Sequence, residues 1–425
     1  MITAIDAYMV LDSRGYPTVC AEVIIDNQFK GKAYVPSGAS TGQYEALELR
    51  DGDNSYYCGK GINKVLAIIK NKLTPLLMHQ SFDTQAQFDD KLKQIDGTKT
   101  LHSLGANTVL SLSLAFARAM ANKHQVELYQ SINHDHKQIL PIPMLNVVNG
   151  GAHANNTLDI QEFMIVPHGF EYFSEAMRAG CEVYHHLRQY LQAHNYSTAV
   201  GDEGGFAPNI DSAENVLDML SEIITKSGYT LGREISFALD IAASEFYQSG
   251  SYHYANKTLS SHALVDQWLT LTQAFPILSI EDPLADDDIE GWQLMTKQVN
   301  DQCLVVGDDL LVTSYERLKQ GIDDHWMNSI LIKLNQVGTL TDTMRAIQLA
   351  KHNEKSYIIS HRSGETEDDF IADLAIATNA PFIKTGAPCR SERLAKYNRL
   401  LAIEHLNGAK LYKLNNVKNL YGQIT

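Results

Sequence analysis

The stretch Phe237-Ala238-Leu239-Asp240 is the first of six short apolar runs that each stop at a charged residue. The other five runs are Leu278-Ser279-Ile280-Glu281, Val305-Val306-Gly307-Asp308, Ile330-Leu331-Ile332-Lys333, Ile358-Ile359-Ser360-His361 and Pro381-Phe382-Ile383-Lys384. Their last residues recur at intervals close to the length of one strand, one helix and two turns. Continuous apolar runs that alternate with helical segments are typical of parallel strands covered on both faces. The pattern predicts a (β/α) barrel.

Along the chain, the residues that end these runs are first three acids and then a lysine, a histidine and a second lysine. In a barrel, residues at the carboxyl ends of the strands project onto one face, where such enzymes carry out their chemistry. A charge after a single buried strand can also mark only the point where the strand meets water. Six in series, acids first and bases after, favour a site with a metal-binding side facing a cationic side.

The composition restricts the classes of function. The chain has 425 residues, 44% of them hydrophobic, and a formal net charge of −15, which argues against general binding to nucleic acid or anionic membranes. No apolar run is long enough to span a membrane, and Met1-Ile2-Thr3-Ala4-Ile5-Asp6 lacks the features of a secretory signal. The five cysteines are scattered and are expected to be free, small buried residues in a reducing compartment, so the cytoplasm is the expected location.

Two domains are predicted. Residues 1–136 begin with three strand candidates and continue with helical periodicity, including a helix from Asn107 to His124, as in a small α+β domain. The proline-containing segment Lys137 to Pro143 marks the boundary to a barrel domain at residues 137–425. The small residues 37–42, with two glycines, predict a mobile lid whose backbone can approach a ligand, although a simple connector is the alternative.

Two helix starts are also predicted from capping residues. Asp83 is expected to cap a helix that ends at Gly97. Asp211 and Glu214 fit a capping box before a helix that ends at Gly228.

The three acids of the strand ends predict a site for a hard cation. Asp240, Glu281 and Asp308 offer oxygen ligands without a paired Cys or His ligand nearby, which favours Mg²⁺ over zinc. The adjacent Asp282 and Asp309 are alternative ligands. Because successive side chains of a strand point in opposite directions, the first acid of each pair is preferred.

The basic strand ends predict the remaining chemistry. A lysine beside a metal and another cation, such as Lys333 or Lys384, can have its proton affinity lowered and serve as a base. His361-Arg362-Ser363-Gly364 supplies a guanidinium and small donors for phosphate or carboxylate. Glu203, set among glycines, could deliver or receive a proton on the opposite face. Together these groups suit proton abstraction beside a carboxylate, followed by loss of a leaving group.

The chain closely resembles the enolase (phosphopyruvate hydratase) family. The resemblance runs from about Asp12 to Glu404, and the compact length resembles the bacterial members. The motifs that carry it are Ser37-Gly38-Ala39-Ser40-Thr41-Gly42, Asn149-Gly150-Gly151-Ala152-His153, Asp159-Ile160-Gln161-Glu162-Phe163-Met164, Gly201-Asp202-Glu203-Gly204-Gly205-Phe206-Ala207-Pro208-Asn209, Ser279-Ile280-Glu281-Asp282-Pro283-Leu284, Leu331-Ile332-Lys333-Leu334-Asn335-Gln336, Ser360-His361-Arg362-Ser363-Gly364-Glu365-Thr366 and Lys384-Thr385-Gly386-Ala387-Pro388-Cys389-Arg390-Ser391-Glu392-Arg393.

The resemblance implies a fold and an activity. The expected fold is an α+β N-terminal domain followed by a modified (β/α)8 TIM-type barrel whose second strand runs antiparallel. The expected activity is the glycolytic and gluconeogenic interconversion of 2-phospho-D-glycerate and phosphoenolpyruvate plus water, with two Mg²⁺ ions. Lys333 would remove the C2 proton and Glu203 would protonate the departing C3 hydroxyl. The metal ligands implied are Asp240, Glu281 and Asp308 for the first ion, and the Ser40 region with substrate for the second.

The other residues implied by the resemblance complete the substrate pocket. They are His153, Gln161, Glu162, His361, Arg362, Ser363 and Lys384. The resemblance also implies a homodimer or a ring of dimers, and it leaves open a surface or secreted pool and partners in RNA-processing assemblies. Direct nucleic-acid binding is not expected.

A few positions depart from the family pattern. Tyr16 replaces an expected asparagine, Cys20 lies where an acid is commoner, and Asn155 stands where the family often has aspartate. None of them removes a named catalytic group. They leave room for a paralogue that acts on a related phosphonate or hydroxy acid, or for an additional binding role.

Overall fold

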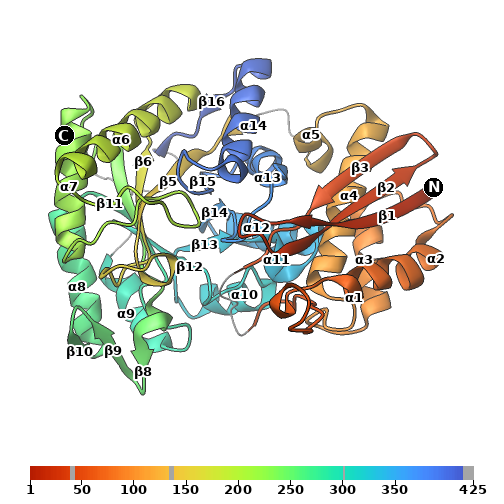
Figure 1. Cartoon of the computed structure of the whole chain (residues 1–425), viewed down its shortest axis with the longest axis horizontal. Helices are drawn as coiled ribbons and strands as arrows, with labels where there is room; N and C mark the ends of the chain where they lie inside the picture. Colours follow the sequence, from red (N-terminus) through yellow and green to blue (C-terminus); the bar gives the residue numbers. More distant parts are fainter. Residues whose placement is uncertain (39–43, 134–137, 300–301, 415–425) are drawn as a thin grey trace.

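The computed structural model describes residues 1–38, 44–133, 138–299 and 302–414. A three-stranded sheet with its helices forms one end of the molecule, and a closed barrel forms the other (Figure 1). The predicted domain boundary after residue 136 and residues 39–42 of the predicted lid, including Ser40, lie outside the described residues.

The N-terminal sheet is antiparallel and has the order β1-β2-β3. Its strands are β1 (Ile2–Leu11), β2 (Pro17–Ile25) and β3 (Phe29–Tyr34), which confirms the three strand candidates. Asp26 and Asn27 both have positive φ, as a tight hairpin turn requires. The helices that follow are α1 (Asn63–Ile68), α2 (Thr74–Leu77), α3 (Gln85–Asp96), α4 (Ala106–His124) and α5 (Leu128–Ile132).

The helix α4 packs directly on β2 and β3. A Cβ atom at Gly31 would lie 2.0 Å from the carbonyl oxygen of Ala115, so only glycine allows this close approach of strand to helix. The helix begins one residue before the predicted Asn107 and ends at His124 as predicted.

Both predicted N-caps are wrong by one residue. Thr84, not Asp83, caps α3, because its side chain accepts a hydrogen bond from the backbone N–H of Gln87. Ser212, not Asp211, caps α7 (Ala213–Lys226), and its hydroxyl accepts from the backbone N–H of Asn215. In each case the residue in extended conformation directly before the helix provides the acceptor.

Eight strands close into a barrel in the order β11-β12-β13-β14-β15-β5-β6-β7. β6 is antiparallel to both of its neighbours, and the other neighbouring strands are parallel. This confirms the modified TIM-type barrel and the reversed second strand. The strands are β5 (Ile142–Asn149), β6 (Glu162–Pro167), β7 (Ile235–Asp240), β11 (Ile277–Glu281), β12 (Leu304–Gly307), β13 (Ser329–Ile332), β14 (Ser356–Ser360) and β15 (Phe382–Lys384).

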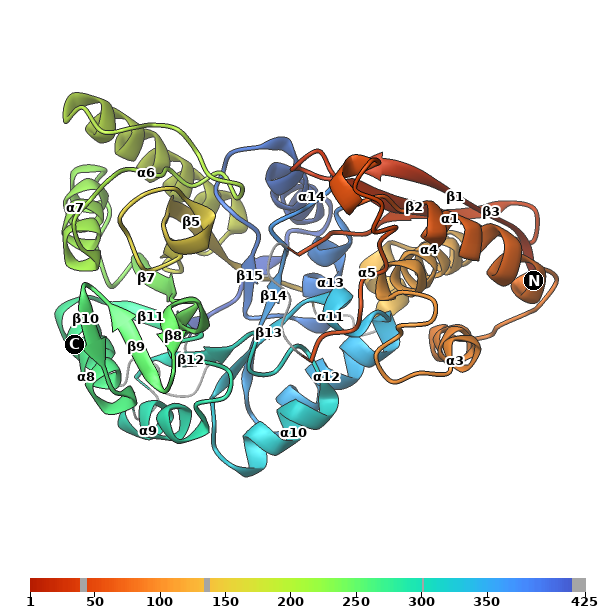
Figure 2. The ribbon, with the colours of Figure 1, turned by 60° about the horizontal axis from the view of Figure 1, so that its bottom comes forward.

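Helices surround the barrel strands (Figure 2). They are α6 (Phe173–Ala193), α7, α8 (Ser261–Ala274), α9 (Ile289–Val299), α10 (Tyr315–Asp323), α11 (Leu334–Val337), α12 (Leu340–His352), α13 (Phe370–Thr378) and α14 (Ser391–Asn407). Short strands β8 (Tyr247–Gln248), β9 (Ser251–Tyr254) and β10 (Lys257–Leu259) form a small separate sheet, and β4 (Ile139–Leu140) pairs with β16 (Lys410–Leu411).

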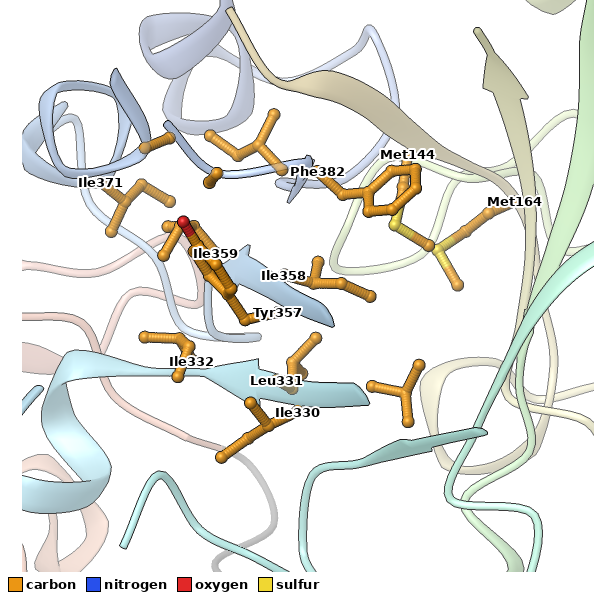
Figure 3. Close-up of a cluster of buried hydrophobic side chains, with 14 of the residues drawn as sticks. Met144, Met164, Ile330, Leu331, Ile332, Tyr357, Ile358, Ile359, Ile371 and Phe382 are labelled. Carbon is orange, nitrogen blue, oxygen red and sulfur yellow. The ribbon is translucent and has the colours of Figure 1, made fainter. Parts of the chain in front are cut away.

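The core of the barrel lies on both faces of its strands. Consecutive residues Ile330, Leu331 and Ile332 are all buried, as are Ile358 and Ile359 on the next strand (Figure 3). Strands buried on both faces explain why these segments are continuously apolar in the sequence. The barrel therefore holds the carboxyl ends of its strands in a rigid frame.

Charged pairs tie the N-terminal domain to the barrel. Arg118 on α4 contacts Asp368 at 2.6 Å and Asp369 at 2.8 Å, just before α13. Nearer the carboxyl ends of the strands, the backbone N–H of Ala46 donates to the carbonyl oxygen of Gln336 at 2.8 Å. The contact between Ala46 and Gln336 brings the segment that follows residue 43 to the rim of the barrel.

All five cysteines of the chain are free, as predicted. Cys20 and Cys303 are buried as expected, but Cys58 is exposed, because it lies in a surface turn of the N-terminal domain.

Candidate active site

The six charged strand-end residues come together at one end of the barrel. A cavity there is lined by Asp240, Asp308, Lys333, His361 and Lys384. The sixth residue, Glu281, lies directly against Lys384. The strands that carry these residues are neighbours in the barrel, so their carboxyl ends meet although they are far apart in the sequence.

Lys384 lies among three of the acids. Its Nζ atom is 3.0 Å from Asp240, 2.9 Å from Glu281 and 3.2 Å from Glu162. Burial lowers the pKa of Lys384, but the surrounding carboxylates outweigh burial and raise this pKa well above its ordinary value. The ammonium group therefore stays charged and holds the acids together.

A second lysine contacts the third acid. Lys333, which follows β13, donates to Asp308. Burial lowers the pKa of Lys333, and Asp308 raises it so that it ends above the ordinary value. The sequence predicts a lowered proton affinity for Lys333. In the chain alone, the pKa of Lys333 is raised instead. The side-chain amide of Gln336 also donates to Asp308, at 2.9 Å.

Asp282 and Asp309, the alternative ligands, have different surroundings. Asp282 accepts hydrogen bonds from the backbone N–H groups of Asp308 and Asp309, at 2.9 and 3.0 Å. Its carboxylate thus shapes the turn after β12. Asp309 borders the cavity, and burial raises its pKa to about 7. The preference for Asp308 over its neighbour stays a prediction.

Glu203 enters the cavity from the segment between β6 and β7. Its carboxylate accepts a hydrogen bond from the Asn146 side chain at 3.0 Å, and it lies 3.4 Å from Nε2 of His361. Nδ1 of His153 lies 3.5 Å from Glu162 and 4.0 Å from Glu203. These groups thus form one polar cluster at the cavity.

Glu162 and Glu203 are both buried, and their carboxylate oxygens lie within 4.8 Å of each other. Burial raises the pKa of Glu162 well above its usual range, and the neighbouring Glu203 raises it further. Burial also raises the pKa of Glu203, but its histidine neighbours and Arg393 reverse this, so that its pKa lies below the usual range. The Asn146 amide also donates to the Glu203 carboxylate, which favours its ionised form. Of the two acids, Glu162 is the one whose pKa shift favours the protonated form.

Arg362 follows His361 and is buried with its partners. Its Nη1 atom contacts both carboxylate oxygens of Glu45 at 3.1 Å and the side-chain oxygen of Asn335 at 3.2 Å. Ser363 lines the same cavity. Glu45 belongs to the segment that reaches the barrel rim from the N-terminal domain.

The remaining predicted residues also border the cavity. Gln161 lies just before β6, and its side-chain amide donates to Asp240 at 3.3 Å. His153, Glu162 and Ser363 line it as well. Apart from Ser40, which is outside the described residues, and Glu281 behind Lys384, the structure places every predicted site residue at this cavity.

Sequence reasoning missed several residues of this site. Asn146 was detectable, because it interrupts the apolar run of β5. Glu45 carries no local signal, and Gln336 and Arg393 lie within the quoted motifs but were given no role, since their partners are distant in the chain.

The charges at the cavity leave room for a cation. Buried carboxylates outnumber the lysine and arginine side chains that contact them, and the donors on the acidic side are oxygens. Among the described residues, the oxygens of Asp282, Asp308 and Asp309 lie within 4.8 Å of one another, as do ligand atoms of His153, Glu162 and Glu203. A buried, all-oxygen acidic side fits a hard divalent cation such as Mg²⁺.

Comparison with protein-family models matches almost the whole chain. Residues 2–132 match the model described as "Enolase, N-terminal domain". Residues 137–419 match the model described as "Enolase, C-terminal TIM barrel domain". Within the described ranges of the chain, the helices are all too short or too polar to cross a membrane.

Proposed function

The chain belongs to the enolase family, as a lyase of the enolase superfamily, and we propose that it interconverts 2-phospho-D-glycerate and phosphoenolpyruvate plus water. The observation that carries the proposal is that two proton-transfer groups line the same cavity. Lys333 borders it from the end of one strand, and Glu203 borders it from the segment before β7. Two such groups at one cavity suit removal of one proton from a small substrate and delivery of another.

Two Mg²⁺ ions are part of the proposal. Asp240, Glu281 and Asp308 would hold the first, and the Ser40 region would hold the second together with the substrate. Bound Mg²⁺ supplies positive charge that stabilises the second negative charge built up beside the substrate carboxylate. The excess of buried carboxylates supports the first site.

Lys333 is proposed to remove the C2 proton. Its contact with Asp308 fixes Nζ at the wall of the cavity. A cation bound to Asp308 would compete with Lys333 for that carboxylate, and weakening of this pair favours the neutral amine that a base requires.

Glu203 is proposed to protonate the departing C3 hydroxyl. The amide of Asn146 fixes one carboxylate oxygen, so the other can face the substrate. Burial raises the pKa of the neighbouring Glu162. The pKa of Glu203 is lowered in the chain alone, so its role as an acid requires that the negative charge of bound substrate raise this pKa.

Anion binding is assigned to the other side of the cavity. Arg362 and Ser363 provide donors for the phosphate, and Lys384 provides charge for the carboxylate end. His153, Gln161, Glu162 and His361 would complete the contacts with substrate. These assignments rest on the family and on the position of the side chains at the cavity.

An activity assay with and without chelator tests the proposal. The purified chain is incubated with 2-phosphoglycerate, and formation of phosphoenolpyruvate is followed with excess Mg²⁺ and with EDTA. Turnover with Mg²⁺ that disappears with EDTA is the expected result. A folded protein without turnover under either condition would show that the chain acts on another substrate, such as a related phosphonate or hydroxy acid.

We also propose that the chain acts in glycolysis and gluconeogenesis as a cytoplasmic homodimer or ring of dimers, with domains at residues 1–136 and 137–425. The two family models meet between residues 132 and 137, which supports the boundary. Light scattering of the purified protein would measure the mass of the assembly.

A further inference from the structure

Arg393 is a charged residue with no exposed surface. It lies in the first turn of α14, next to the cavity but outside its lining. A buried guanidinium is costly unless hydrogen bonds satisfy its N–H groups. The partners of Arg393 therefore indicate what it is for.

The partners of Nη1 and Nη2 belong to two loops of the active site, while Nε lies 3.5 Å from Glu392 on the same helix. Nη1 lies 2.7 Å from Nδ1 of His361 and donates to the carbonyl oxygen of Arg362 at 2.7 Å. Nη2 donates to the carbonyl oxygens of Ser363 at 2.7 Å and Asp202 at 3.0 Å. One side chain thus links the loop after β14 with the loop that carries Glu203.

The contact with His361 determines where the imidazole proton lies. A guanidinium stays protonated and can only donate, so Nδ1 of His361 must accept. In a neutral ring the proton is then on Nε2, the atom 3.4 Å from Glu203. The opposite tautomer would place an N–H of His361 against an N–H of Arg393, and a lone pair against the Glu203 carboxylate. Both contacts would be repulsive.

The surroundings also keep this ring neutral. Burial lowers the pKa of His361 to about 4, Glu203 raises it and Arg393 lowers it further. Glu365 also acts on the ring and raises the pKa of His361. Near neutral pH the ring is therefore a single-proton donor.

We propose that Arg393 is a positioning residue that locks His361 in the Nε2–H tautomer and so aims a hydrogen-bond donor at Glu203. The catalytic role of Arg393 rests on the proposed function, in which Glu203 delivers a proton to the substrate. The Nε2–H donor of His361 would orient the Glu203 carboxyl group for that step. The tautomer itself is a property of the folded chain and can be measured without substrate.

The test is ¹⁵N NMR of the full-length chain labelled at histidine nitrogen, with a His361→Gln variant to assign the signals. The expected wild-type result is one neutral tautomer with the proton on Nε2, unchanged between pH 8 and pH 6. A proton on Nδ1, or a charged ring at pH 7, would overturn the proposal even if the enzyme is fully active. If the correct tautomer is found in an inactive protein, the proposed reaction fails and the present inference stands.

Two variants test the role of Arg393 itself. Arg393→Gln should change the single His361 tautomer into a mixture, whereas Arg393→Lys, which keeps a charged donor, should retain more of the Nε2–H form. Arg399→Gln is the control, because Arg399 lies on the same helix but pairs with Asp373 and Glu127, away from His361. An unchanged tautomer in Arg393→Gln would refute the assignment. If these variants do not fold, the wild-type measurement alone decides.

Discussion

Replacement of Lys384 by methionine would remove the cation at the centre of the acidic side. The side chain of Lys384 is 3% exposed and contacts three carboxylates at 2.9 to 3.2 Å. Methionine has a similar volume, so the main change is the loss of charge and hydrogen bonds. We expect Lys384→Met to destabilise the chain strongly in the absence of divalent ions.

The magnitude follows from the burial of the pair. Removal of one partner from a buried ion pair costs about 3–5 kcal/mol, because the remaining charge is left without compensation. That is a large part of the ~5–15 kcal/mol by which folded domains are stable. The pKa of Lys384 is raised in the folded chain. The contribution of Lys384 to the free energy of unfolding is therefore fully present below the ordinary lysine pKa, and it is lost only as the pH rises through the pKa of the folded chain.

The pH dependence of the variant is also predictable. The pKa values of Glu162 and Glu281 are raised, primarily by burial, so lower pH favours their neutral forms in the folded chain. We therefore expect the stability loss in Lys384→Met to be smaller at pH 6 than at pH 8.

Urea unfolding in EDTA and in Mg²⁺ measures these effects. Mg²⁺ should recover more stability in Lys384→Met than in the wild type, because the released carboxylates become available as ligands. Lys396→Met is the control, since it removes another buried lysine, 1% exposed and 2.8 Å from Glu365. Its stability loss should not respond to Mg²⁺. A loss below about 1 kcal/mol in EDTA for Lys384→Met would refute the reasoning on buried pairs.

Three further changes test other parts of the structure. Arg118→Met should lower stability at pH 7 by about 1–3 kcal/mol, less than for a fully buried pair because Arg118 is partly exposed. Burial raises the pKa of Asp368, but Arg118 lowers it below the ordinary value, so the loss should decrease only below the ordinary aspartate pKa, and urea unfolding at pH 7 and pH 5 should give the same loss. Burial raises the pKa of Asp89 to about 6, so its charged form disfavours folding. The wild type should therefore gain about 2 kcal/mol relative to Asp89→Asn as the pH falls from 7 to 4, and parallel pH-dependent curves would contradict this. Cys58→Ser should abolish the fastest reaction with a thiol reagent, because Cys58 is exposed whereas Cys303 is buried.

The barrel and much of its site were predictable because they follow from periodic features. The apolar strands of a barrel recur with their helices, and each ends where a functional side chain can project, so Asp240 and Lys333 are visible as the last residues of apolar runs. The reversal of β6 is different. A buried strand has the same apolar pattern in either direction, and only the family resemblance predicted it.

The contacts within the site could not be read from the sequence. Glu45 and Arg362 are 317 positions apart, and no local pattern indicates that their side chains meet. The protonation of Lys333 depends on its contact with Asp308, which only the folded structure provides. The helix caps differ from the prediction for a simpler reason. Thr84 and Ser212 adjoin equally good capping residues, and the local backbone conformation decides between them.

Exchange of the C2 proton of 2-phosphoglycerate with solvent tests the central claim most directly. With Mg²⁺ in deuterated water, NMR would follow C2 deuteration by the wild type, Lys333→Ala and Glu203→Gln. Loss of a general base costs about 10²–10⁴-fold, so Lys333→Ala should lose exchange to that extent. Glu203→Gln should retain exchange while losing dehydration, since it keeps the base and lacks the acid. Equal loss of exchange in both variants would contradict the assignment of Lys333 as base and Glu203 as acid.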